Sequence, residues 1–249
     1  MEKLYSCTRG AGDPPFTLVH GWTCDHSAML PVAEAFPDHA STLVDLLGHG
    51  KSPKASDYSI EAQAAAALAV APARSVWIGH SMGAQVATAA AAMAPERVAG
   101  LVLLDPAFIA PHDKAVAFGE GMRAQLARVD IPSMIEAFGR GQIVKAADPD
   151  AVEKLVQVMK ATDPAVTRAA WDAILAWDGR AAMAKVACPS LLIVVDKPLN
   201  RPADVARLNK QVLTGQVAGS GHMVQFEVMD QVAAMIRRFL QINFSLSER

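Results

Sequence analysis

The segment with the clearest chemical potential is Gly79-His80-Ser81-Met82-Gly83, which fits the pattern G-x-S-x-G. It lies between an apolar run at 75–79 and a helical pattern at 81–94. A sharp turn from strand to helix crowds the backbone, so glycine suits both flanks, and the serine hydroxyl is lifted off the sheet beside a helix N-terminus. We therefore predict Ser81 as a nucleophile. The alternative is a glycine-rich turn that contains an incidental serine.

Four motifs resemble those of the α/β-hydrolase family. They are L-V-H-G-W at 18–22, D-L-L-G-H-G-K-S at 45–52, G-H-S-M-G at 79–83 and G-S-G-H-M-V at 219–224, and their order and spacing match as well. The resemblance covers most of the chain, although residues 107–186 match only in position and helical character. It implies the α/β-hydrolase fold and a serine hydrolase that needs no cofactor.

A neutral serine is a weak nucleophile and needs a neighbouring base. The family's chain order is serine, acid, histidine, which implies His222 in the loop after the last predicted strand. The glycines beside it let this loop bring an imidazole over the sheet edge, and the alternative is a surface histidine. The other histidines are expected to shape loops (His20, His49 and His80) or to lie at the surface or in loops (His26, His39 and His112).

Acyl transfer places negative charge on a carbonyl oxygen, which backbone N–H groups usually receive. The residue after the nucleophile, Met82, is one expected donor. His20-Gly21-Trp22 resembles the family's H-G-x turn, which implies the Trp22 amide as the second donor and its indole as part of the pocket wall. The alternative is ordinary packing of Trp22, with the donor one residue away.

The acid that would orient the imidazole has two candidates. Family members commonly end the penultimate strand with G-x-x-D, but in LLIVVDKPLN at 191–200 the acid position falls on Pro198–Leu199. A loop shorter by one residue would still bring Asp196 into place. Asp105 ends the strand next to the nucleophile strand, where some family branches have their acid, and its alternative role is capping. We favour Asp105 and keep Asp196 open, and we interpret Asp45 as a turn stabiliser.

The elements that must position these residues alternate along the chain. Apolar runs predict strands at 4–7, 16–20, 41–45, 75–79, 98–104, 190–195 and 214–218, and periodicity predicts helices at 28–35, 60–71, 81–94, 203–211 and 228–240. Strands that are apolar throughout and separated by helices are typical of a parallel sheet covered on both faces. We predict an α/β fold with a mostly parallel sheet flanked by helices.

One long segment interrupts this alternation, because it shows helical periods and no convincing strand. Within it, Asp163 predicts an N-cap with Pro164 in the first helical position, and Gly179 predicts a helix end. We interpret the segment as a helical cap inserted into the core. The predicted division is a core of residues 1–106 and 187–249 and a cap of residues 107–186.

The cap range is rich in large apolar side chains. Most are expected to pack inside the cap, and a minority to face Ser81 and make the site apolar and partly closed. They are Phe108, Phe118, Met122, Met134, Phe138, Met159, Trp171 and Trp177. The cap's arginines are expected on a solvated face, although one that reached inward would favour a carboxylate-bearing substrate. Cys24 is a further pocket candidate.

The composition argues against several classes of protein. The chain has 249 residues, 52% of them hydrophobic and 19% charged, with a formal net charge of −2. We therefore expect a sizeable core, no disorder and no nucleic-acid partner. Three cysteines without a C-x-x-C pair and seven unclustered histidines predict no metal site. The sequence shows neither a membrane-length apolar run nor a signal-peptide pattern, so we expect a cytoplasmic protein.

Three classes of function fit these motifs. The first is a cofactor-independent hydrolase of a small, largely apolar ester, lactone or C–C diketone, through a Ser-His-Asp triad and an acyl-enzyme. The second is a lyase or cofactor-free dioxygenase in which His222 is the base, because His20-Gly21-Trp22 near Asp25-His26 faintly resembles the quinolone dioxygenase branch. The third is a non-catalytic binding protein. A homodimer is compatible with the Ala- and Met-rich surface.

Overall fold

We describe residues 3–144 and 148–244 of the protein in a computed structural model. Within these residues, seven strands form one sheet in the order β1-β3-β2-β4-β5-β6-β7. Only the β1–β3 pair is antiparallel among the strand pairs of the described chain. The strands are β1 (Ser6–Arg9), β2 (Phe16–Val19), β3 (Ser41–Val44), β4 (Ser75–His80), β5 (Val98–Leu104), β6 (Ser190–Val194) and β7 (Val212–Gln216). The predicted α/β fold with a mostly parallel sheet is confirmed.

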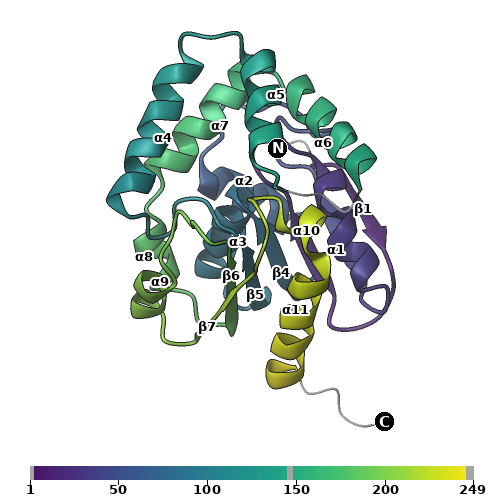
Figure 1. The fold of residues 1–249 in the computed structure, drawn as a ribbon. Helices are drawn as coiled ribbons and strands as arrows, with labels where there is room; N and C mark the ends of the chain where they lie inside the picture. The colour runs from purple at the N-terminus through teal and green to yellow at the C-terminus, as the bar shows by residue number, and fades with distance from the viewer. Residues whose placement is uncertain (1–2, 145–147, 245–249) are drawn as a thin grey trace.

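Helices cover both faces of the sheet and one of its ends (Figure 1). One face packs against α2 (Ile60–Leu68), α3 (Met82–Met93) and α8 (Gly179–Met183), and the other against η1 (His26–Met29), α1 (Leu30–Ala35) and α11 (Met229–Asn243). Two short helices, α9 (Pro202–Leu208) and α10 (Val224–Glu227), follow β6 and β7. We call the four helices above the sheet the cap helices: α4 (Asp113–Leu126), α5 (Ile131–Gly141), α6 (Pro149–Ala161) and α7 (Pro164–Ala176).

The strands are apolar on both faces because both faces are covered. Successive side chains of a strand point to opposite sides. Along β4, Trp77 packs into the layer with α2 and α3, whereas Val76 and Ile78 pack into the layer with α1 and α11. All three side chains are fully buried. Since each strand residue joins one of two apolar layers, the sheet is held rigidly, and its carboxyl edge can present side chains in fixed positions.

The cap helices lie between β5 and β6 in the chain, and most begin at an aspartate. The Asp163 side chain accepts a hydrogen bond from the Ala165 N–H at 2.7 Å, with Pro164 in the first turn of α7, as predicted. The core and cap ranges predicted above include residues 1–2, 145–147 and 245–249, which lie outside the described residues. The division into core and cap stays a prediction, and α8, inside the predicted cap range, packs on α3 and α9.

The prediction that Gly179 ends a helix is wrong. Helix α7 already ends at Ala176, and Gly179 is the first residue of α8, where the Asp178 side chain accepts a hydrogen bond from the Ala181 N–H at 3.0 Å. Glycine is needed there for a different reason. A Cβ at this position would lie 2.6 Å from the Ile109 carbonyl oxygen, so only glycine lets α8 approach the chain that follows β5.

Other differences between the predicted and observed elements are shifts of their ends. The first strand lies two residues later than predicted and the last strand two residues earlier, and α2 stops at Leu68, short of the predicted Ala71. Element ends of this kind are the least determined by local sequence. Among the described helices, none combines the length and the apolar character needed to cross a membrane.

Three histidines, His20, His49 and His80, are buried below the sheet's carboxyl edge. His20 Nε2 accepts a hydrogen bond from the Leu46 N–H at 3.0 Å, which a protonated ring could not do. Burial lowers the pKa of His20, and it lowers the pKa values of His49 and His80 to about 3, aided by the neighbouring rings of His20 and His222 respectively. The fold therefore holds these rings in the neutral form.

We predict that acid destabilises the protein through these rings. Between pH 6.5 and about 3, an unfolded histidine binds a proton that His49 and His80 exclude in the folded state. The unfolded state then binds more protons, so the free energy of unfolding falls as pH is lowered through this window, by up to about 1.4 kcal/mol per pH unit for each ring. Urea unfolding between pH 7.5 and 4.5 measures this slope. His49→Asn should flatten it, and an equal slope in the variant and the parent would contradict the assignment.

Candidate active site

Ser81 occupies the turn between β4 and α3 in a strained backbone conformation. Its φ is 54° and its ψ is −117°, a region that residues other than glycine rarely adopt. The Ser81 N–H donates to the Leu104 carbonyl at 3.1 Å, and the Ser81 carbonyl accepts from the Ala84 and Ala107 N–H groups at 3.0 and 3.2 Å. These bonds fix the turn against β5. The surrounding fold therefore holds Ser81 in a backbone conformation that serine by itself disfavours.

The glycines around Ser81 are required by close backbone approach. A Cβ at Gly83 would lie 2.2 Å from the Val19 carbonyl oxygen, and a Cβ at Gly79 would lie 2.3 Å from that of Gly83. Gly21 is also near, because a Cβ there would lie 3.2 Å from the Ser81 Cβ. The G-x-S-x-G pattern thus marks the place where β4, α3 and the loop after β2 converge, which is the context that gives the motif its meaning.

Asp105, and not Asp196, lies against the His222 ring. The distance between His222 Nδ1 and Asp105 Oδ2 is 2.6 Å, and the carboxylate is buried while the imidazole is half-buried. Asp105 follows β5 with a φ of 36°, and its N–H donates to the Ile193 carbonyl at 2.8 Å. Because a carboxylate only accepts hydrogen bonds, Nδ1 carries the proton of this bond, and the tautomer it fixes leaves the lone pair of a neutral ring on Nε2.

Asp196 has a different position. It is exposed at the end of β6, and its neighbour Lys197 is exposed as well. Both line the same cavity as Ser81 and His222. Among the hydrogen bonds and ion pairs of the described residues, none joins Asp196 to His222.

The loop that carries His222 is held by the core and by the cap. His80 Nε2 donates to the His222 carbonyl at 2.9 Å, and the two rings are 4.7 Å apart. The His222 N–H donates to the carbonyl of Gln142, which follows α5, at 2.8 Å. A Cβ at Gly221 would lie 2.2 Å from that same carbonyl oxygen. The imidazole is therefore fixed at its backbone as well as at Nδ1.

Glu227 of α10 joins the same two segments through its side chain. Its two carboxylate oxygens accept hydrogen bonds from the Gly221 N–H at 3.0 Å and from the Val144 N–H at 2.7 Å. The Gly221–His222 loop and the loop between α5 and α6 are thus bridged by one carboxylate. Sequence reasoning missed Glu227 and Gln142. The contact of Gln142 is made by a backbone carbonyl, which side-chain identity cannot reveal.

Ser81 and His222 line one cavity of about 450 Å³, which we call the central cavity. The hydrogen bonds of the described residues do not include one between the Ser81 hydroxyl and the imidazole. Catalytic hydrogen bonds often tighten only when substrate is present. The walls are mainly apolar. Five of the eight large cap side chains singled out in the sequence line them, which is more than the predicted minority: Phe108, Phe118, Phe138, Met159 and Trp171.

Two further residues of the cavity were singled out in the sequence. Cys24 lines the cavity and is buried, and desolvation raises the pKa of its thiol to about 12. A thiol so far from ionisation is a poor nucleophile. Trp22 also lines the cavity, and its indole N–H donates to the Thr167 carbonyl of α7 at 2.9 Å. The turn after β2 is thereby tied to the cap.

The residues of both expected oxyanion donors are close to Ser81 along the chain or in space. Met82 is the first residue of α3, where a backbone N–H has no partner within its own helix. Trp22 follows Gly21, whose backbone is close to Ser81. The hydrogen bonds found in the described part of the chain include none from the Trp22 or Met82 N–H. Neither group therefore has a protein acceptor among the described residues.

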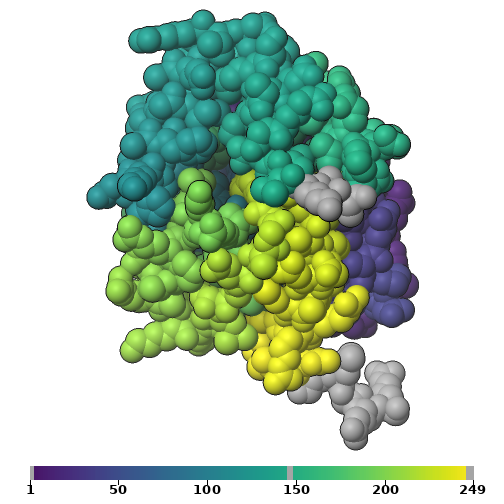
Figure 2. Space-filling model, viewed as in Figure 1, coloured from purple at the N-terminus to yellow at the C-terminus, as the bar shows by residue number. Residues whose placement is uncertain are grey.

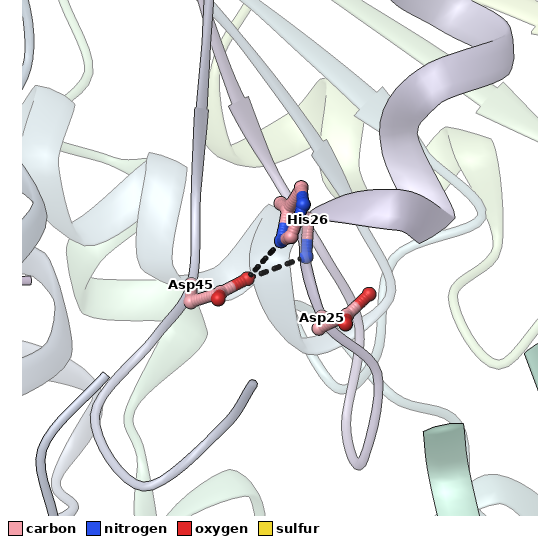
Figure 3. Close-up of side chains that lie close together, drawn as sticks. All are labelled: Asp25, His26 and Asp45. Atoms are coloured by element: carbon pink, nitrogen blue, oxygen red, sulfur yellow. Dashed lines mark hydrogen bonds and ion pairs between the residues drawn. The ribbon is translucent and has the colours of Figure 1, made fainter. Parts of the chain in front are cut away.

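Asp25, His26 and Asp45 form a cluster that by proximity could hold a cation (Figure 3). The Asp45 oxygens, however, already accept hydrogen bonds from the His26 N–H, His26 Nδ1 and the Lys51 N–H, at 2.7, 2.8 and 2.8 Å. An Asp25 oxygen accepts from the Ser27 N–H at 2.8 Å. The cluster is thus satisfied by protein donors, and Asp45 stabilises the turn as predicted.

Comparisons with known proteins agree with this architecture. The chain is 27% identical over 242 residues to the biotin biosynthesis bifunctional protein BioHC of Cellvibrio japonicus (strain Ueda107), covering 92% of this chain and 48% of that protein. It is 41% identical over 110 residues to the pimeloyl-[acyl-carrier protein] methyl ester esterase of Methylococcus capsulatus (strain ATCC 33009 / NCIMB 11132 / Bath), covering 43% of each. The matches thus span about half the length of these relatives or less.

Solved structures show the same fold. A thermophilic esterase from Thermogutta terrifontis superimposes with a TM-score of 0.81 at 24% identity, covering 97% of this chain and 94% of the other. The enol-lactonase from Burkholderia xenovorans LB400 gives 0.78 at 20% identity, covering 96% of each. The model of the alpha/beta hydrolase family matches residues 18–235. This protein therefore belongs to the alpha/beta hydrolase family.

Proposed function

We propose that this protein is a serine hydrolase that cleaves a small, largely apolar carboxylic ester or lactone. The observation that carries the proposal is the 2.6 Å contact between His222 Nδ1 and Asp105 Oδ2, at a cavity that also contains Ser81. The arrangement leaves His222 Nε2 as a base toward the cavity. Among relatives, methyl ester esterases, an esterase and an enol-lactonase support an ester or lactone over other acyl compounds.

The reaction proceeds in two balanced stages. The Ser81 hydroxyl gives its proton to His222 Nε2 as its oxygen attacks the carbonyl carbon, and the Trp22 and Met82 N–H groups receive the oxyanion. Collapse of this intermediate expels the alcohol, which takes the proton from His222, and leaves an acyl-enzyme on Ser81. A water then gives a proton to His222 and attacks the acyl carbon, and the acid is released as Ser81 regains its proton.

The apolar walls favour hydrophobic acyl or alcohol groups. A cavity of about 450 Å³ lies at the lower end of the range typical of small-molecule pockets. Phe138 and Trp171 pack against the Trp22 indole with ring centroids 5.6 and 4.6 Å apart. In the proposed reaction, this apolar wall lowers the local dielectric around the Trp22 turn, which would strengthen hydrogen bonds from backbone donors there.

We predict that Ser81→Ala and His222→Ala each lower kcat/KM for p-nitrophenyl butyrate by at least about 10³-fold. A fluorophosphonate should label the parent protein once and Ser81→Ala not at all. The measurement also separates the competing chemistry. Full activity in Ser81→Ala, with none in His222→Ala, would replace the hydrolase with a lyase or oxygenase in which the histidine alone is the base.

A second prediction separates the two acids. Asp105→Asn removes the charge that stabilises the imidazolium, and an amide N–H₂ facing Nδ1 favours the wrong tautomer, so kcat should fall by about 10³–10⁴-fold. Asp196→Asn is the matched control, because this exposed carboxylate lines the cavity without contacting His222. Its kcat should stay within about threefold of the parent. The reverse order of effects would move the acid to Asp196.

We further predict that Glu227 positions His222. In Glu227→Gln a single amide oxygen replaces two acceptors, so the Gly221 N–H or the Val144 N–H loses its partner. The imidazole then shifts, and kcat should fall on the order of tenfold while KM changes little. The rate of fluorophosphonate labelling of Ser81 should fall in parallel, which a merely structural role would not require. Glu96→Gln, at an exposed carboxylate, is the control, and equal kcat in both variants would contradict the role.

A further inference from the structure

A second hollow, the basic groove, opens beside the central cavity. It has a volume of about 850 Å³ and lies between the chain at the start of α4, helix α8 and the loop from β6 into α9. Its lining shares Phe118, Lys197 and Leu199 with the central cavity, so the two spaces adjoin each other at these side chains. Figure 2 shows the face on which the teal cap helices meet the green chain after β6, and the surface is hollowed between them.

Four cationic side chains line the groove: Lys114, Arg180, Lys197 and Arg201. The opposing carboxylates are Asp113 and Asp204, and Asp204 already pairs with Arg207, which lies outside the groove, at 2.6 Å. Among the ion pairs of the described residues, none involves Lys114, Lys197 or Arg201. The groove is therefore locally positive, although the chain as a whole carries a formal charge of −2.

Apolar side chains lie nearer to Ser81, in the central cavity, and the cationic side chains lie beyond them, in the basic groove. Phe118 is 41% exposed, an unusual exposure for a large aromatic side chain, and together with Leu199 it forms the junction of the two spaces. A molecule that extends from Ser81 would first meet the apolar cavity wall, then this junction, and then the cations. That order fits an apolar chain that ends in a negative charge.

The loops that carry these groups are pinned together, so the groove exists before a ligand binds. Asn200 is buried, and its side chain accepts hydrogen bonds from the Ile109 and Ala110 N–H groups at 2.8 and 2.7 Å. It also donates to the Pro106 and Ala107 carbonyls, each at 2.7 Å. His112 adds a bond from Nε2 to the Pro198 carbonyl at 3.1 Å. The loop of Lys197 and Arg201 is thereby fixed to the loop that follows Asp105.

We propose that the basic groove is an anion subsite, and that the enzyme prefers esters carrying a carboxylate or phosphate remote from the carbonyl that is cleaved. The proposal rests on the proposed hydrolase function and names its substrate class. The scissile carbonyl lies at Ser81, the alkyl chain crosses the junction at Phe118 and Leu199, and the anion lies among the four cations. Substrate specificity then comes from the charge at one end of the ester and from apolar contacts along its alkyl chain.

The test compares matched pairs of esters. Monomethyl esters of α,ω-dicarboxylic acids are compared with methyl esters of monocarboxylic acids of equal length, and acetyl esters of ω-hydroxy acids with alkyl acetates. The two series place the anion on the acyl side and on the alcohol side. Acetyl esters of ω-hydroxyalkyl phosphates distinguish phosphate from carboxylate. The readout is the ratio of kcat/KM for the anionic ester to that for its neutral partner.

We expect this ratio to exceed about fivefold in at least one series and to shrink between 0.05 and 0.5 M salt. Arg201→Glu should lower it about fivefold, mainly through KM, because one cation of the groove is replaced by an anion. Lys210→Glu is the matched control. It reverses an exposed charge just beyond the other end of α9, outside the groove, and should leave the ratio as in the parent.

The subsite and the hydrolase function fail in different ways. Hydrolysis of neutral esters with a ratio near one in every series, or with equal effects of Arg201→Glu and Lys210→Glu, overturns the subsite and leaves the hydrolase standing. If no ester is hydrolysed, the proposed function fails, and calorimetry with hexanoate still decides the subsite. Hexanoate binding that Arg201→Glu weakens and Lys210→Glu does not supports it, and the absence of such binding overturns it.

Discussion

The hydrogen bond between the His222 ring and the Asp105 carboxylate joins residues separated by 117 positions in the chain. It requires that β5 end beside β4 and that the loop after β7, which carries His222, reach the carboxyl edge of the sheet. It also requires that the carboxylate be buried. A buried carboxylate is stable only with a partner. The hydrogen bond therefore depends on the arrangement of the whole carboxyl edge of the sheet, and the parallel strand order provides that arrangement.

Around this contact the cap acts as a second support. The indole of Trp22 holds α7, and Gln142 and Glu227 hold the histidine loop to the end of α5. On the cap side, these contacts use the backbone groups of Thr167, Gln142 and Val144, so their geometry depends on where the cap helices lie and hardly on the cap's side chains. The cap helices can therefore support the histidine and the turn after β2 through their backbone positions, whatever side chains they carry.

Much of this could be predicted from the sequence, and the limits have physical causes. Ser81 can be predicted from the sequence because close backbone approach requires glycine on both sides of it. The strands can be predicted because burial on both faces makes them apolar throughout. The choice between Asp105 and Asp196 was open because it depends on how two loops lie against each other. Asn200, which pins those loops across 91 residues, gives no local signal. Gly179 was misinterpreted because a glycine needed for close packing looks in sequence like one that ends a helix.

The attachment of Trp22 has a consequence for how a substrate reaches the site. Its indole is bonded to α7, while its own backbone N–H belongs to the turn beside Ser81. Thr162, just before α7, is also bonded to the Thr23 carbonyl at 2.9 Å. The cap is thus hydrogen-bonded to the same short turn that lies beside Ser81. A substrate too large for the cavity would displace α7 and, with it, the turn of Trp22. Oversized molecules would then be rejected because the Trp22 N–H is moved away from the reacting carbonyl, as well as because they lack space.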